Sequence, residues 1–245
     1  MTVETAIDPG SAAPGARAGR VCNRPAAVTR SLLGYGPLAG ACYLASGLAQ
    51  ALTRDGFDLR RHDLSLLANG PLGWIQILTL VLTGLMTITS AVGLFRALPR
   101  GRAAAWAASL LSAYGLALVA AGMFVADPMN GFPVGTPDGP PRQVTLHGLL
   151  HIAAGGIGFV CLVAAAFVLA RLFSRNSRRG WAWASLGAGL VVLAGFLGVA
   201  TGSASSLAVL GLWIGVVTGW GWIAAVCVHL YRRTPDPRQP RDRAA

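Results

Sequence analysis

The histidines are the residues of this sequence with the clearest potential for chemistry, because there are only four and two of them stand four residues apart. His147 and His151 occupy positions i and i+4 at the start of an apolar stretch. Residues with this spacing share one face of a helix, with Cβ atoms about 6 Å apart, so both imidazoles could bind one metal ion. The pair therefore predicts a metal site if further ligands lie nearby.

Three further residues are candidates to complete such a site. His62 and Ser65 lie in one polar segment, His62-Asp-Leu-Ser65, and Asp127 follows another apolar stretch. A zinc ion with three protein ligands keeps one position open for water and lowers the pKa of that water to about 7. The site we predict for a zinc ion has His62, His147 and His151 as ligands, Asp127 as fourth ligand or general base, and Ser65 in support.

Each of these residues also has a structural interpretation. The histidine pair lacks the glutamate of the zincin motif, and histidines at a membrane interface can simply be held by hydrogen bonds. Asp127 precedes a proline, which disfavours helix in the residue before it and is typical of a helix end. The segment from His62 to Ser65 is suited to capping a helix. A haem bound by His62 with His147 or His151 is a further alternative.

The elements that must position these residues are membrane-spanning helices. Hydrophobic residues make up 54% of the 245-residue chain and charged residues only 12%, about half the charged fraction of an ordinary soluble domain. The apolar residues fall in blocks of about 20, the length at which a helix crosses about 30 Å of hydrocarbon. We predict an all-α bundle of six transmembrane helices at about 31–53, 72–95, 103–126, 146–170, 181–201 and 206–231.

The arginines predict the orientation of this bundle. All 20 basic residues are arginine, and 16 of them fall in the two termini and in the connections after the second and fourth spans. By the positive-inside rule, this side of the membrane and both termini are cytoplasmic. We expect flexible basic tails at 1–30 and 232–245 around a transmembrane domain at 31–231. Because the basic residues mark topology, the net charge of +11 indicates no nucleic-acid partner.

This orientation places the candidate site on the extracytoplasmic side. His229 lies at the opposite end of the last span, about 30 Å away, and cannot join it. No span carries Asp, Glu, Lys or Arg in its middle, which argues against an ion-coupled transporter or a proton pump. The leading hypothesis is a metal-dependent hydrolase acting on a lipid-like substrate at the level of the headgroups. The alternatives are a non-catalytic structural or accessory membrane protein and a carrier of a neutral solute or lipid.

Two ordered signatures in the chain resemble those of the domain-of-unknown-function 998 family of prokaryotic multi-pass membrane proteins. The first joins His62-Asp-Leu-Ser65-Leu-Leu, Gly73-Trp74-Ile-Gln76 and Gly93-Leu-Phe-Arg96-Ala. The second joins Phe124-Val-Ala-Asp127-Pro128, a loop rich in Gly and Pro, and Thr145-Leu-His147-Gly-Leu-Leu-His151. The resemblance covers about residues 31–231. It implies a prokaryotic multi-pass integral membrane protein, and it implies no activity. We expect the protein in the bacterial cytoplasmic membrane.

The same residues are also similar, more distantly, to a superfamily of membrane hydrolases and receptors that includes the alkaline ceramidases. Those enzymes use a serine, an aspartate and three histidines around zinc near one membrane face. The corresponding inventory in this chain is Ser65, Asp127, His62, His147 and His151. The chain departs from that superfamily in having six predicted spans rather than seven and in the order of serine and histidine in the first signature.

Overall fold

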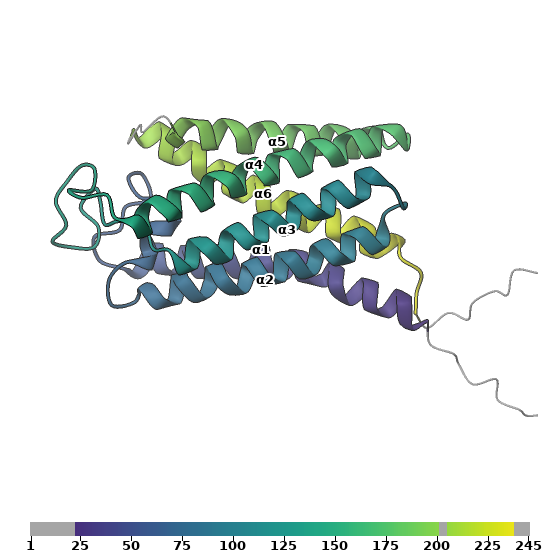
Figure 1. The fold of residues 1–245 in the computed structure, drawn as a ribbon, viewed down its shortest axis with the longest axis horizontal. Helices are drawn as coiled ribbons and strands as arrows, with labels where there is room; N and C mark the ends of the chain where they lie inside the picture. Colours follow the sequence, from purple (N-terminus) through teal and green to yellow (C-terminus); the bar gives the residue numbers. More distant parts are fainter. Residues whose placement is uncertain (1–22, 201–204, 238–245) are drawn as a thin grey trace, which may run out of the picture.

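Six long helices form most of the protein in a computed structural model that describes residues 23–200 and 205–237 (Figure 1). Their bounds are α1 Arg24–Thr53, α2 Gly73–Ala97, α3 Arg102–Met123, α4 Leu146–Arg175, α5 Arg179–Ala200 and α6 Ser206–Arg233. A short 3-10 helix, η1 (Leu64–Ala68), lies in the connection between α1 and α2. Each of the six helices is long and apolar enough to cross a membrane, which confirms the predicted all-α, six-span architecture.

The helices pack in the order in which they follow along the chain, and α6 returns to pack against α1, which closes the bundle. Both ends of the described chain lie at the same end of the bundle (Figure 1). There, the Asn23 N–H donates to the Pro237 carbonyl over 3.0 Å, and Arg30 forms an ion pair with Asp236 at 3.7 Å. We call this the termini end. The connections 54–72 and 124–145 lie at the opposite end, which we call the loop end.

The start of α1 differs from the sequence-based prediction. The helix begins at Arg24 rather than near residue 31, so residues 24–30 form its first turns instead of part of a tail. Asn23 caps this start, since its side-chain oxygen accepts a hydrogen bond from the Ala26 N–H, and Pro25 suits the first turn of a helix. At the other end, α6 extends to Arg233, so the first two residues of the tail predicted at 232–245 are helical. Residues 1–22 and 238–245 of the two predicted tails, and residue 201 of the fifth span, lie outside the described residues.

Small residues and buried polar groups bring neighbouring helices together. A Cβ atom added to Gly84 of α2 would lie 2.5 Å from the Gly115 carbonyl oxygen of α3, so only glycine permits this close crossing. Between α1 and α2, the Gln50 amide donates to the Gln76 side-chain oxygen over 2.9 Å. Such hydrogen bonds satisfy polar groups that the membrane interior cannot solvate.

Aromatic side chains fill the middle of the bundle. Trp220 of α6 is only 1% exposed, and its ring centroid lies 5.1 Å from that of Tyr43 of α1 and 6.0 Å from that of Tyr114 of α3. Leu162 of α4 is equally buried, at 2% exposed. A centre packed in this way argues against a carrier whose pathway runs along the bundle axis.

Candidate functional site

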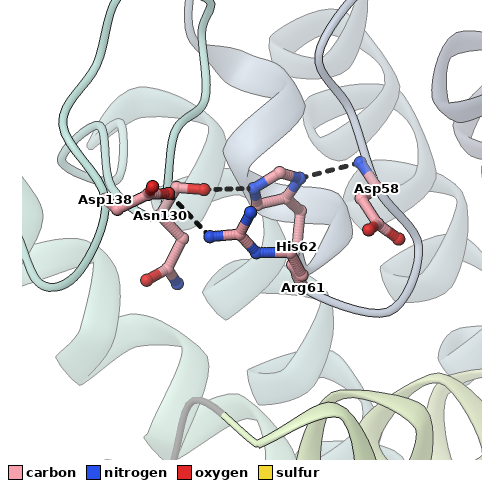
Figure 2. A network of polar contacts seen from close by, with 5 residues as sticks. All are labelled: Asp58, Arg61, His62, Asn130 and Asp138. Atoms are coloured by element: carbon pink, nitrogen blue, oxygen red, sulfur yellow. Dashed lines mark hydrogen bonds and ion pairs between the residues drawn. The ribbon is translucent and has the colours of Figure 1, made fainter.

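His62 lies at the loop end, where one ring nitrogen bonds within its own connection and the other bonds to the second long connection. Its side chain is 2% exposed. Nδ1 accepts a hydrogen bond from the Asp58 N–H over 2.9 Å, and Nε2 lies 2.8 Å from the Asn130 carbonyl oxygen (Figure 2). Because Nδ1 accepts, the ring proton is on Nε2, which donates to Asn130. The lone pair that a neutral imidazole would offer to a metal ion is thus already used by the backbone.

The surroundings of His62 reinforce this junction. The imidazole packs against Phe57 and Phe132, with ring centroids at 5.2 and 5.6 Å, and the two phenylalanine rings contact each other. Arg61 adds a second link between the two connections, since its guanidinium donates to Asp138 over 2.7 Å (Figure 2). Because this ion pair is exposed to solvent, it contributes little to the stability of the protein. The buried ring of His62 therefore helps to fasten one connection to the other, together with the Asn69 amide, which donates to the Ala126 carbonyl over 3.1 Å.

Arg54 supports the same region from the end of α1. Its guanidinium donates to the carbonyl oxygens of Leu67 and Asn69 on either side of the end of η1, and it lies over the Phe132 ring at 5.0 Å. Partial burial lowers the pKa of the Arg54 guanidinium, which nevertheless stays charged because arginine titrates so far above neutrality. Arg54 thus holds η1 against the end of the bundle.

The histidines of α4 have separate roles. His151 is 8% exposed, and its Nδ1 lies 2.8 Å from the Phe124 carbonyl oxygen and 3.0 Å from that of Ala121. These oxygens belong to the end of α3, where carbonyl groups lack partners within the helix. His147 is exposed, with its ring 5.8 Å from the Phe124 ring. His151 therefore caps α3, while His147 lies at the surface.

Asp127 closes the start of α4. Its two carboxylate oxygens accept hydrogen bonds from the Thr145 N–H at 2.9 Å and from the Thr145 hydroxyl at 2.6 Å. The Thr145 oxygen in turn accepts from the Gly148 N–H over 3.0 Å. A Cβ atom on Gly148 would lie 2.1 Å from the Asp127 carboxylate, so glycine is required here. A carboxylate at this position is stabilised by the positive end of the helix dipole.

Ser65 and its neighbour Asp63 belong to η1. The Asp63 Oδ1 atom accepts hydrogen bonds from the Ser65 hydroxyl at 2.6 Å and from the Leu66 N–H at 3.2 Å, which caps η1. The structure thus gives the predicted site residues separate structural contacts and does not gather them around one point. Within residues 23–200 and 205–237, no group of three or more His, Cys, Asp and Glu side chains is arranged to hold a metal ion.

Asp63 and Ser65 instead face a partly enclosed cavity of about 90 Å³ beneath η1. Residues from α1, α4 and α6 complete its wall. The full lining consists of Tyr43, Asp63, Leu64, Ser65, Phe159, Leu212, Trp213 and Val216. The Trp213 indole N–H donates to the His62 carbonyl over 3.3 Å, so the segment that fastens the loops also orients one wall of the cavity.

The aromatic residues of this cavity were not among the predicted site residues. One signal for Trp213 was available, because it lies well inside its predicted span, whereas most of the other tryptophans lie near span ends, where interfacial anchors are expected. Tyr43 and Phe159 carry no comparable signal. Only the packing of three separate helices brings them together.

Fold and composition together define a multi-pass membrane protein with six apolar helices. The sequence model of the family described as "Protein of unknown function (DUF998)" matches residues 37–229. The chain belongs to this family, as its two signatures indicated. No curated protein and no solved structure matches the chain.

Proposed function

We propose that this protein binds a small molecule in the cavity beneath η1. Residues 63–65, which we call the roof, cover this cavity, and the hydrogen bonds at the loop end keep the roof in place. The observation that carries the proposal is the cavity itself, which combines aromatic walls with the carboxylate of Asp63. Ligand sites in proteins are typically concave and apolar, with a few fixed polar groups. The cavity has this composition.

The construction of the roof supports the proposal. His62 fastens the two connections, the next residue, Asp63, caps η1, and Trp213 is bonded to the His62 carbonyl. Leu66 and Leu67 of η1 are 2% and 0% exposed, so the helix that continues from the roof is packed firmly into the bundle. A site built from supported residues can hold a ligand with little loss of conformational freedom.

The lining favours a ligand group with a positive charge. Tyr43, Phe159 and Trp213 offer aromatic faces or edges to the cavity, and aromatic rings attract organic cations, most strongly when water is excluded. Asp63 contributes a negative charge, and no described arginine lies within ion-pair distance of it. A compact quaternary ammonium group such as that of choline matches this combination of aromatic lining and negative charge.

A metal-dependent hydrolase is the function that the histidines suggested first. It would require His62 to leave its two backbone partners and to approach His147 and His151 with a zinc ion. The hydrogen bonds of His62 give no support to that rearrangement, so we favour binding. Elemental analysis of the purified protein separates the two, because the hydrolase requires one bound metal per chain and a loss of stability in chelator.

The expected location follows from the arginines. We propose that the protein resides in the bacterial cytoplasmic membrane with the termini end in the cytoplasm, where most of its arginines lie. The cavity beneath η1 then belongs to the extracytoplasmic half of the protein. A ligand would reach it from outside the cell or from the outer leaflet.

The proposal is tested by ligand-dependent thermal unfolding of the full chain in detergent. Choline is expected to raise the unfolding temperature in a saturable manner, as any ligand specific for the folded state does. Val216→Phe fills the cavity and should abolish the effect. Val217→Phe makes the same change on the exposed face of α6 and should preserve it.

The neutral alcohol in which carbon replaces the choline nitrogen serves as the charge control. If it stabilises the protein as well as choline does, the cavity binds by shape alone and the preference for a cation is wrong. If Val216→Phe leaves the stabilisation by choline intact, the cavity is not the site.

A further inference from the structure

Three arginines line a groove at the termini end of the bundle. The groove has a volume of about 620 Å³ and lies between the end of α4 and the beginning of α5. Arg171 and Arg175 stand four residues apart on α4, and Arg179 is the first residue of α5. One or two turns further into the spans, the lining becomes apolar, with Phe167, Ala170, Ala182, Trp183 and Leu186.

Among the residues that the structure describes, these guanidinium groups have no acidic partner. The sequence contains no Asp or Glu between residues 139 and 235, so α4, α5 and α6 carry no carboxylate side chain. The ion pairs formed within the described chain are Arg30 with Asp236 and Arg61 with Asp138. Like charges four residues apart repel each other on a helix, so this cluster gains stability from an anion bound between its members.

The place of the groove in the span identifies the anion. Arginines at the end of a transmembrane helix lie at the level of the lipid headgroups, and the apolar lining below them lies at the level of the acyl chains. Trp183, which is 71% exposed, is suited to the boundary between the two levels. The first N–H groups of a helix lack partners within it, so the start of α5 adds further positive potential beside Arg179.

We infer that this groove binds an anionic phospholipid, with the headgroup phosphate among Arg171, Arg175 and Arg179 and an acyl chain along Phe167 and Leu186. Guanidinium groups bind phosphate oxygens with paired hydrogen bonds, and basic pockets between helices select anionic headgroups. The groove is at the opposite end of the bundle from the cavity beneath η1. The inference is therefore independent of the proposed function.

Native mass spectrometry of the full chain tests the inference, with phosphatidylglycerol and phosphatidylcholine of identical acyl chains as competing probes. We expect the wild type to retain one phosphatidylglycerol in preference to phosphatidylcholine. The triple variant Arg171→Gln/Arg175→Gln/Arg179→Gln should weaken this retention by roughly a hundredfold, since each basic residue near an anionic surface contributes about fivefold. High salt should reduce the preference because it screens exposed charges.

A second triple variant, Arg100→Gln/Arg102→Gln/Arg232→Gln, removes the same charge from the same end of the bundle outside the groove. It should keep the retention of the wild type. Replacing the three groove arginines by lysine keeps the charge that directs membrane insertion, and it should give retention between those of the wild type and the glutamine variant.

Three results would overturn the inference. Equal retention of the two lipids by the wild type would show that charge plays no part. An equal loss in both glutamine variants would show that the effect comes from net charge rather than from the groove. Binding of inorganic phosphate without retention of phosphatidylglycerol would make the site one for a soluble anion.

Discussion

The exchange of His62 for alanine is the perturbation that separates a structural histidine from a metal ligand. His62 is buried and bonded to two backbone groups, whereas His147 is exposed and makes one ring contact. Both were predicted as zinc ligands, so a metal site would require both. The structural account requires only His62. His147→Ala is thus the matched control.

The magnitude follows from the groups that the exchange leaves behind. The Asp58 N–H and the Asn130 carbonyl would lose their partner, and a buried polar group without a partner costs about 1–3 kcal/mol. Loss of the imidazole, which packs against Phe57 and Phe132, removes further packing energy. Because both connections lie near the surface, water can replace part of this loss, and we expect a total of about 3 kcal/mol. His147→Ala should change the free energy of unfolding by less than about 0.5 kcal/mol.

Two assays measure the effect. Denaturation by detergent titration gives the free energy of unfolding of each variant, with and without a chelator. Trypsin reports the local effect, since Arg60 and Arg61 are exposed beside His62 and should be cut faster once the connections separate. Equal stability of the two variants would refute the reasoning. So would a loss of about 3 kcal/mol in the wild type on addition of chelator, because that result would assign the stability to a metal.

Three further predictions concern the rest of the bundle. Gly148→Ala places a Cβ atom against Asp127 and should cost about 1–2 kcal/mol by displacing this cap, whereas Gly155→Ala meets open space and should be neutral or slightly stabilising in the same denaturation assay. Gln50→Leu alone leaves the Gln76 side-chain oxygen without its donor and should cost more than the double exchange to leucine, as a double-mutant cycle measures. Green fluorescent protein at the C-terminus should fluoresce, and alkaline phosphatase inserted in the connection 124–145 should be active. The reverse pattern would contradict the orientation.

The architecture could be predicted from the sequence because its signal is local. A block of about 20 apolar residues that crosses the membrane must do so as a helix, because only its own backbone can satisfy its hydrogen bonds. The boundary of α1 was harder to place, since the cap at Asn23 and Pro25 lies among basic residues that resemble a tail. Capping depends on one side chain and a few backbone groups, and composition averaged over a window does not detect it.

The polar residues of the loop end could be identified from the sequence, but their partners could not. Asp127 was recognised as a residue at a helix end, and it does contact the first turn of α4. The segment containing His62 was recognised as a possible cap, and its neighbour Asp63 caps η1. That the His62 ring bonds to Asn130, 68 residues away, depends on how two connections fold over the bundle. Such a contact cannot be predicted from residue types and their spacing.

The measurement that tests the central claim most directly is a crystal structure of the full chain with tetramethylarsonium, a quaternary cation whose arsenic scatters anomalously. The account predicts one anomalous peak in the cavity beneath η1, between Asp63 and the rings of Tyr43 and Trp213. It also predicts that the peak is lost in Asp63→Asn and kept in Asp55→Asn, an exposed carboxylate of the same connection. A peak elsewhere, or a cavity closed by its own side chains with no peak, would contradict the account.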